Sequence, residues 1–231
     1  MDITTILGLI VVITGLIMGV TLEGANLVMY LNLPAAFIVL VGTFGVTTIT
    51  TSAETVLKLP VILGKAFSKI KENRSEIVSI FVELLGKARK DGILSLEKEL
   101  SNIENKFFNK GLQLVIDGID PKHVEKYLET EIMQIEERHK KGIAFFEAAG
   151  GYAPTLGIMG TVMGLVNILA NLSSPDQIGS MISVAFIATL YGVGAANVVL
   201  LPIAAKLKAK SEEEILTCEM IMEGILSLPL S

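Results

Sequence analysis

The basic residues of this 231-residue chain are confined to two regions, and this distribution constrains the fold more than any other feature. All 19 lysine and arginine side chains lie within Lys58–Lys141 or Lys206–Lys210. Four long stretches without any charge lie at Ile3–Leu22, Gly24–Ala53, Ala148–Pro175 and Gln177–Ala205. A helix needs roughly 20 apolar residues to cross about 30 Å of hydrocarbon. The sequence therefore predicts an all-α, polytopic membrane protein with four transmembrane helices.

The charges between these stretches predict the orientation. The first two stretches are separated by Glu23 and the last two by Asp176, so both short connections carry an acid but no base. Basic residues are retained on the cytoplasmic side of a membrane. We therefore expect both termini and the basic block to be cytoplasmic and the two short hairpins to face outward. The first stretch lacks a basic n-region and a small-residue cleavage site, so we expect it to be retained as a span.

These patterns divide the chain into four regions. Residues 1–53 should form the first two spans with their external hairpin, and residues 54–147 a cytoplasmic helical domain. Residues 148–205 should form the last two spans, and residues 206–231 a cytoplasmic helical tail.

Amphipathic helices are expected in the cytoplasmic domain. Glu76–Lys90 places its apolar side chains on one stripe and stops near Gly92, a residue suited to a helix C-cap. Two shorter helices are expected over Leu94–Ile103 and Lys106–Ile116. The stripe of the first helix consists of Ile77, Ile80, Phe81, Leu84 and Leu85.

The next helix has the clearest start signal, with Asp120 as N-cap and Pro121 at the first helical position. No strong breaker separates it from the third span, so we expect one long helix to run from the cytoplasm into the membrane. The fourth span should begin at Ser174–Gln177 and end at Pro202–Ala205. An amphipathic tail containing Ile215, Leu216, Met220 and Ile221 should then pack on the cytoplasmic helices.

The side chains outside the membrane do not suggest catalysis. A net charge of −5 gives no general attraction to nucleic acid. His123 and His139 lack metal-ligand spacing and are expected on the solvated surface, while the single Cys218 is expected to be a buried small hydrophobe. We therefore expect neither an enzyme nor a resident metal.

The uncharged stretches contain no Asp, Glu, Lys, Arg or His side chain. Membrane proteins that move ions usually keep such a group at depth. Either this chain conducts nothing, or a partner supplies the carboxylate.

Small and polar residues nonetheless gather on the third span. Pro154, Gly157, Thr161 and Gly164 share one helix face, on which proline frees a backbone carbonyl and Thr161 adds a hydroxyl. Such a face could coordinate a dehydrated cation or line a wet path. Composition alone favours a packing surface, in which Gly160 and Gly164 form a G-x-x-x-G pair. The fourth span repeats the pattern with Ala185, Thr189, Gly192 and Ala196.

Motifs along most of the chain resemble the MotA/PomA family of flagellar stator subunits. The third and fourth spans carry the resemblance in Phe146–Val166, Ala185–Asn197 and Leu201–Ile203. It extends to Leu33–Thr43 in the second span and to Ala88–Glu97 in the cytoplasmic block. The order and spacing of these segments agree with the map of four spans.

This resemblance implies a ring-shaped homopentamer in the bacterial cytoplasmic (inner) membrane, surrounded by lipid. The ring would enclose two helices of a peptidoglycan-anchored MotB-type subunit, whose aspartate carries the ion. Influx of protons or sodium, worth about 2.3 kcal/mol per charge per 100 mV, would turn the ring and push the cytoplasmic domain against the rotor protein FliG. No cofactor is implied.

The resemblance also assigns roles to individual residues. Arg89 and Glu97 match the charged pair that engages the rotor, and they are expected on two helices that meet near Gly92. Pro154 and Pro202 match the two prolines that couple ion flow to rotation.

The ion pathway would include Pro154, Gly157, Thr161 and Thr189. Thr189 matches the threonine near the carrier aspartate, and Thr161 stands where sodium-type members tend to have threonine. Residue 188 is alanine, however, where the best-known sodium type has a second threonine. Transient sodium binding at Thr161 and Thr189 is therefore only slightly favoured over proton transport.

Two other functions are compatible with parts of the pattern. The related ExbB/TolQ class energises outer-membrane transport or envelope maintenance, but its members generally have three spans and an external N-terminus. The two-span hairpin and the Arg89 and Glu97 pattern favour the MotA class. A non-conducting membrane scaffold would instead predict no effect of Thr189 or Pro154 substitutions on any gradient-driven process.

Overall fold

The computed structural model describes residues 3–68, 74–170 and 175–228. Within these ranges every regular element is a helix and none is a strand, which confirms the all-α prediction. The chain forms two compact units. The first combines Met1–Lys69 with Lys141–Leu207, and the second combines Ile70–Lys140 with Lys208–Ser231.

Three helices of the described chain are long and apolar enough to cross a membrane. They are α1 (Ile3–Leu22), α7 (Pro121–Ala170) and the continuous helix Ile178–Ser227. The last of these comprises α8 (Pro175–Gly194), the π-helical η4 (Ala195–Leu200) and α9 (Leu201–Ser227).

The uncharged stretch Gly24–Ala53 forms a shorter helix than its length suggests. Its helical part is Leu33–Ile49, which comprises α2 (Leu33–Ala36), the π-helical η2 (Phe37–Val41) and α3 (Gly42–Ile49). The Asn32 side chain fixes the start because its Oδ1 accepts the backbone N–H of Ala35 at 2.8 Å. The 3-10 helix η1 (Leu27–Tyr30) lies in the connection between α1 and α2.

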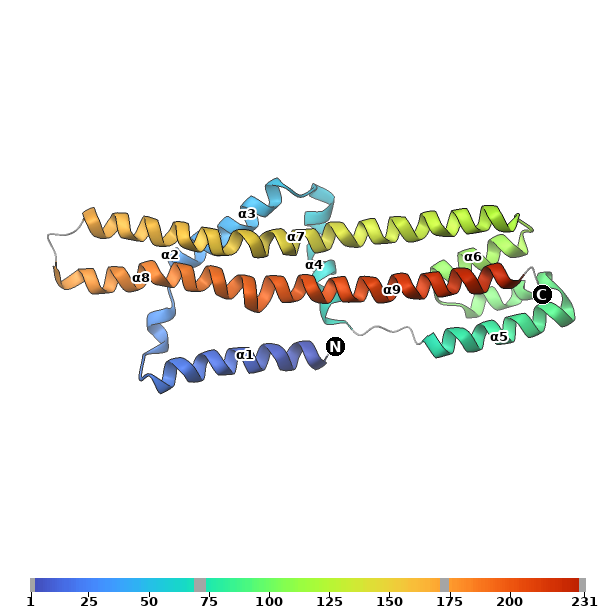
Figure 1. The fold of residues 1–231 in the computed structure, drawn as a ribbon, viewed down its shortest axis with the longest axis horizontal. Coiled ribbons are helices and arrows are strands. Elements are labelled where there is room, and N and C mark those ends of the chain that lie inside the picture. The colour runs from blue at the N-terminus through green and yellow to red at the C-terminus, as the bar shows by residue number, and fades with distance from the viewer. Residues whose placement is uncertain (1–2, 69–73, 171–174, 229–231) are drawn as a thin grey trace. The chain divides into compact units, whose positions relative to one another are not determined.

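The prediction of one long helix is confirmed by α7, which runs unbroken for 50 residues (Figure 1). At its start Asp120 Oδ1 accepts the backbone N–H of Lys122 at 2.9 Å. The predicted end of the fourth span at Pro202–Ala205 is not a helix end, because α9 continues through it. Pro202 directly follows the wide turns of η4, within the continuous helix. The predicted cap Ser174 lies outside the described residues.

Helix α4 (Ala53–Phe67) was not predicted. Its Ser52 N-cap accepts the backbone N–H of Thr55 at 3.4 Å. Ile62 packs against Gly142, where a Cβ would lie 3.1 Å from the isoleucine side chain. The apolar face of α4 joins a core that also contains Phe145, Phe146, Ile203, Ala204 and Leu207.

The second unit has its own hydrophobic core. Helix α5 (Arg74–Asp91), the 3-10 helix η3 (Ile93–Asn102) and α6 (Lys106–Ile116) follow the predicted boundaries to within two residues. They pack with parts of α7 and α9, and burying each large apolar side chain contributes about 1.5–3 kcal/mol. The completely buried members include Leu96, Leu112, Leu128, Ile221 and Ile225.

The C-terminal tail packs on the core through Ile215, Met220 and Ile221, as predicted, although Leu216 is 51% exposed. The prediction that His139 lies on the solvated surface was wrong. The side chain of His139 is only 13% exposed, because Ser211 and Glu214 of α9 lie beside it. Cys218 is buried, as predicted.

Candidate ion pathway and rotor-binding surface

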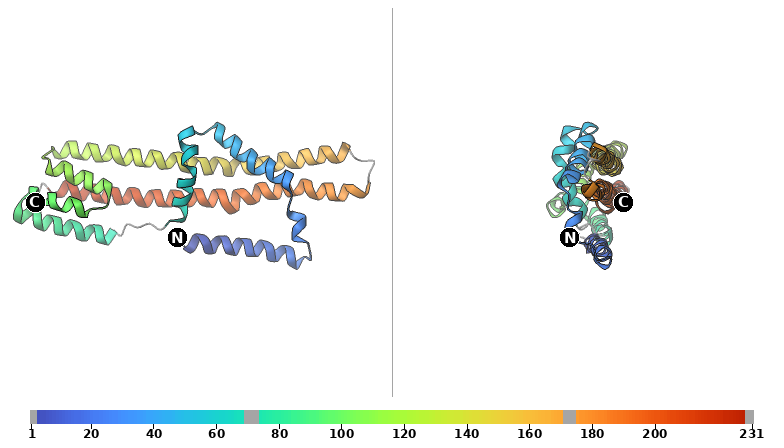
Figure 2. Two further views of the ribbon diagram at one scale, coloured as in Figure 1. Left: turned by 180° about the vertical axis from the view of Figure 1, so that it is seen from behind. Right: turned by 90° about the vertical axis from the view of Figure 1, so that its left-hand side faces the viewer.

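Helices α7 and α8 lie side by side in the first unit, as both views show (Figure 1 and Figure 2). Their backbones are in contact at two glycines. A Cβ added to Gly157 would lie 2.8 Å from the carbonyl oxygen of Ala188, and one added to Gly192 would lie 2.5 Å from that of Ala153. Real Cβ atoms cannot come so close to backbone, so this approach requires glycine at both positions.

The same interface continues along the G-x-x-x-G pair of α7. A Cβ on Gly160 would lie 2.8 Å from the Cβ of Ala188, and one on Gly164 would lie 2.7 Å from the Cβ of Ala185. The packing interpretation of these glycines is therefore confirmed. The small face of α7 meets the small face of α8.

Two hydroxyls lie within this packed interface. Thr161 Oγ1 is 2.5 Å from Thr189 Oγ1, although the two residues are 28 positions apart in the sequence. Thr161 Oγ1 also lies 2.8 Å from the carbonyl oxygen of Ala185 and 3.2 Å from that of Gly157. Thr189 Oγ1 lies 3.5 Å from the same Gly157 oxygen. The structure thus brings Gly157, Thr161 and Thr189 of the predicted pathway together.

This oxygen cluster can rearrange its protons without moving its atoms. Each hydroxyl has one proton to donate and two lone pairs, so the two threonines can donate in either direction along the cluster. Hydroxyl and carbonyl oxygens are also the groups that replace water around a cation in a pore. All four oxygens are neutral, however. A carboxylate from outside the cluster would have to complete a carrier site for an ion.

The two predicted coupling prolines flank one contact between helices. Pro154 of α7 is half-buried and removes the N–H that would bond the carbonyl of Gly150. A Cβ on Gly150 would lie 2.5 Å from the side chain of Leu201, the residue before Pro202. The helix turns that the prolines alter therefore lie next to each other. Sequence reasoning did not predict this proximity.

Tyr191 is a further residue that sequence reasoning missed. Its hydroxyl donates to the carbonyl oxygen of Tyr30 at 2.5 Å and accepts the backbone N–H of Asn32 at 3.1 Å. It thereby ties the start of α2 to α8, two residues after Thr189. A tyrosine in an apolar stretch needs a partner for its hydroxyl, and this was the only signal for the contact.

The predicted rotor-binding residues lie on two elements that meet at one glycine. Arg89 is exposed near the end of α5, and Glu97 is exposed on η3. Gly92 joins the two elements with a φ of 79°, in the left-handed region that glycine occupies readily. The neighbouring Lys90 and Asp91 are exposed as well.

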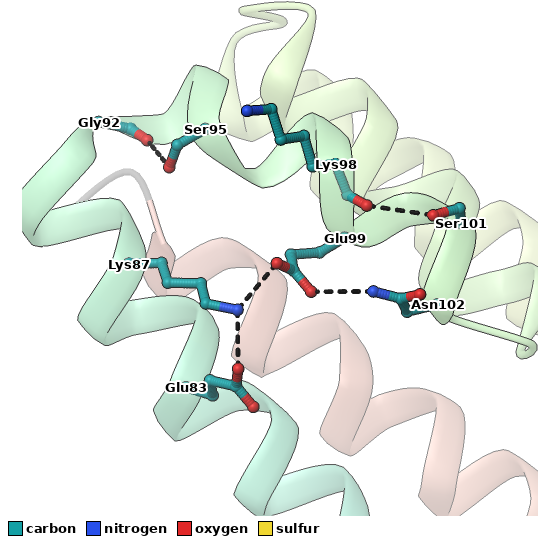
Figure 3. Close-up of polar contacts among 8 residues, drawn as sticks. All are labelled: Glu83, Lys87, Gly92, Ser95, Lys98, Glu99, Ser101 and Asn102. Carbon is teal, nitrogen blue, oxygen red and sulfur yellow. Dashed lines mark hydrogen bonds and ion pairs between the residues drawn. The ribbon is translucent and has the colours of Figure 1, made fainter.

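A charged network lies between the same two elements (Figure 3). Lys87 Nζ is 2.7 Å from Glu83 Oε1 on α5 and 2.8 Å from Glu99 Oε1 on η3. The second oxygen of Glu99 accepts a hydrogen bond from Asn102 Nδ2 at 3.2 Å. The bonds to Glu83 and Glu99 raise the pKa of Lys87, and those from Lys87 and Asn102 lower the pKa of Glu99.

Comparison with known proteins identifies the family. Residues 99–220 match the model of the MotA/TolQ/ExbB proton channel family. Motility protein A of Borreliella burgdorferi is 37% identical over 99% of this chain and 88% of its own length. The chain belongs to the MotA/TolQ/ExbB family. Chemotaxis protein PomA of Vibrio alginolyticus, 36% identical over 99% of this chain and 89% of its own length, is a further relative.

A solved structure of the MotA/TolQ/ExbB family shows the same fold. In the C. jejuni MotAB structure, one chain superimposes with a TM-score of 0.94 at 29% identity, covering 99% of this chain and 89% of that chain. The resemblance to MotA is thus confirmed along nearly the whole chain. These two relatives, named Motility protein A and Chemotaxis protein PomA, match this chain over nearly their full length, which favours this class over the ExbB/TolQ alternative.

Proposed function

We propose that this chain is a stator subunit of a flagellar motor and couples the entry of ions to torque on the rotor. The observation that carries this proposal is the similarity to Motility protein A and to the MotAB structure over 98% of the chain or more. A MotA-type subunit is not an enzyme, and its work comes from the ion gradient.

The neutral oxygen cluster supports a partner of the MotB type. The uncharged stretches offer no carboxylate, basic or histidine side chain, and the Thr161 and Thr189 hydroxyls provide ligands without a negative charge. A peptidoglycan-anchored subunit would contribute an aspartate beside them. A homopentamer of this chain would surround two such helices, so that each of its oxygen clusters meets the aspartate in turn.

The charge distribution supports four spans with both termini in the cytoplasm of a bacterium. Leu33–Ile49 would be the second span, and its 17 residues reach about 25 Å, near the lower limit for crossing the bilayer. Residues 1–53 and 148–205 would then lie in the inner membrane. Residues 54–147 and 206–231 would face the cytoplasm and the rotor.

The mechanism follows from these placements. An entering proton or sodium ion binds the partner's aspartate beside Thr189 and neutralises its charge, so that the aspartate can leave the oxygen cluster. A hydroxyl of Thr161 or Thr189 replaces part of the hydration shell of sodium. Pro154 and Pro202 transmit the resulting conformational change from the oxygen cluster to α9. The exposed charges of Arg89 and Glu97 then act on FliG.

The test is complementation of a bacterium whose own stators are deleted. The chain and its cognate MotB-type subunit are expressed together, and swimming speed is measured against external sodium and against a protonophore. Restored swimming that follows either gradient supports the proposal and identifies the ion. Absence of swimming with both subunits present in the membrane would contradict it. Restoration of outer-membrane uptake instead would indicate the ExbB/TolQ function.

A further inference from the structure

We infer that Lys87 is a positioning residue that bridges α5 and η3 and sets the spacing between Arg89 and Glu97. This inference rests on the proposed function, because it concerns how the two rotor-binding charges are held. Lys87 would not touch the rotor itself. It would determine where the other two side chains meet it.

The junction between the two elements needs such a constraint. Only Gly92 separates α5 from η3, and glycine has more conformational freedom than any other residue. Leu96 anchors η3 in the core and is completely buried. Ile93 and Leu100 of η3 pack against the same core. Apolar contacts are non-directional, so a directional bond between the elements supplies a second kind of fixed point, one that defines the angle between them.

Lys87 is suited to be this second point. At 100° per residue, Lys87 and Arg89 point about 160° apart around α5, so one can face η3 while the other faces solvent. The side chains of Lys87 and Glu99 are 37% and 26% exposed. The comparable pair of Lys140 and Glu136 is 58% and 44% exposed and stays within α7. A shielded pair that joins two elements is less weakened by solvent than a pair on one helix surface.

The element that carries Glu97 depends on side-chain bonds throughout (Figure 3). At ten residues, η3 is long for a 3-10 helix, whose backbone hydrogen bonds have poorer geometry than those of an α-helix. Ser95 Oγ donates to the carbonyl oxygen of Gly92 at 2.6 Å, and Ser101 Oγ donates to that of Lys98 at 3.1 Å. Glu99 lies between these bonds and forms the ion pair that joins η3 to α5.

The charges of the bridge are present at cytoplasmic pH. Because the pKa of Lys87 is raised, its contribution to stability is complete at neutral pH and is lost only as the pH rises through that pKa. Because the pKa of Glu99 is lowered, its contribution is lost only as the pH falls through that pKa. The bridge is therefore a constant feature of the working motor and does not act as a pH switch.

The experiment compares torque and geometry in the same variants. Lys87→Met removes the bridge, and Lys87→Arg keeps it. The charge exchange Lys87→Glu with Glu83→Lys and Glu99→Lys restores it with reversed charges, because both carboxylates contact Lys87. Lys140→Met is the matched control, since it breaks an ion pair within one helix. Stall torque is measured from beads attached to single motors and is divided by the number of stator units in each motor. Geometry is measured as the distance distribution between spin labels at Lys90→Cys and Lys98→Cys, with the buried Cys218 changed to Ala.

We expect Lys87→Met to broaden the distance distribution and to lower stall torque by about two- to fivefold. Loss of a weak ion pair can reduce the population of the correctly spaced conformation by about this factor. Lys87→Arg and the charge exchange should restore both readouts, and Lys140→Met should leave both unchanged. An unchanged distance distribution in Lys87→Met would overturn the inference. So would a broadened distribution with normal torque, or a charge exchange that restores neither readout, since the charge of residue 87 would then matter in itself.

Failure of the inference can be distinguished from failure of the proposed function. If the unaltered chain drives no motor with its cognate partner, the stator function fails, while the spin-label distances still test the bridge. If the unaltered chain drives the motor and Lys87→Met changes neither readout, only the bridge fails.

Discussion

The hydroxyl oxygens of Thr161 and Thr189 lie 2.5 Å apart, on two helices that glycines bring into backbone contact. The two interpretations of the third span are therefore compatible. Glycines supply the close packing, and the packing brings the two hydroxyls within reach of each other and of two backbone carbonyls. Packing and a polar path are properties of one interface.

The close approach of α7 and α8 should depend on Gly157. A Cβ at this position would lie 2.8 Å from a backbone oxygen, which cannot move without shifting α8. Gly157→Ala should therefore destabilise the chain by about 1–3 kcal/mol, the usual cost of overpacking. The measurement is the midpoint of thermal unfolding in detergent. Gly151→Ala on the same helix is the control, because its Cβ would meet nothing within 4 Å. Equal midpoints for the two variants would contradict the packing.

The bond between Tyr191 and the start of α2 should limit local opening. Tyr191→Phe leaves the carbonyl of Tyr30 and the N–H of Asn32 without this partner, at a cost of about 1–3 kcal/mol where the groups are shielded from water. Hydrogen exchange of the peptide containing Asn32 should become faster, as measured by mass spectrometry. Tyr127→Phe, which removes a hydroxyl from an exposed side chain, should leave that peptide unchanged. Slow exchange in Tyr191→Phe would show that the bond does not hold the loop.

Much of the second unit could be predicted because its signals are local. Gly92, Asn105 and Asp120 mark helix ends through their own backbone or side-chain geometry, and the 11 residues of α6 were predicted at the observed bounds. The apolar stripe of α5 is buried, as the helical spacing of its apolar residues predicted. This spacing determines which face of an amphipathic helix meets a core.

The remaining features depend on contacts between distant segments. The absence of charge shows where a membrane can lie, but Asn32 decides where the helix begins within Gly24–Ala53. His139 is shielded because α9 continues past Pro202 and brings Ser211 and Glu214 beside it. The sequence placed Thr161 and Thr189 on small faces, but their contact depends on the register of two helices.

Arg89 and Glu97 should act on the rotor through charge. Single exposed charges contribute only about 0–1 kcal/mol, so one neutralisation can be partly tolerated where Lys90 or Asp91 compensates. Reversing both, as Arg89→Glu with Glu97→Lys, should abolish torque while the subunits still assemble in the membrane. A matching reversal of charge on FliG should restore some rotation. Unchanged torque in the double-reversal variant would show that Arg89 and Glu97 do not act on the rotor through charge.

The orientation predicts which positions a reagent can reach from outside an intact cell. With Cys218 changed to Ala, a membrane-impermeant maleimide should label Asn26→Cys, because the connection after α1 should face outward. It should not label Glu104→Cys or Ser211→Cys until the cells are opened. Labelling of the latter pair alone in intact cells would reverse the topology.

Rotation of single motors in the threonine variants tests the central claim most directly. With the cognate partner present, bead speed is recorded against external sodium for Thr161→Ala and Thr189→Ala, with Thr161→Ser and Thr189→Ser as controls that keep the hydroxyls. If sodium is the ion, loss of an oxygen ligand should raise the sodium concentration for half-maximal speed by about tenfold, equivalent to about 1.4 kcal/mol, and serine should largely restore it. If protons drive the motor, Thr161→Ala should have a weak effect and Thr189→Ala should still slow rotation. Speeds like those of the unaltered chain in both alanine variants, at normal membrane levels, would show that ions do not pass this pair.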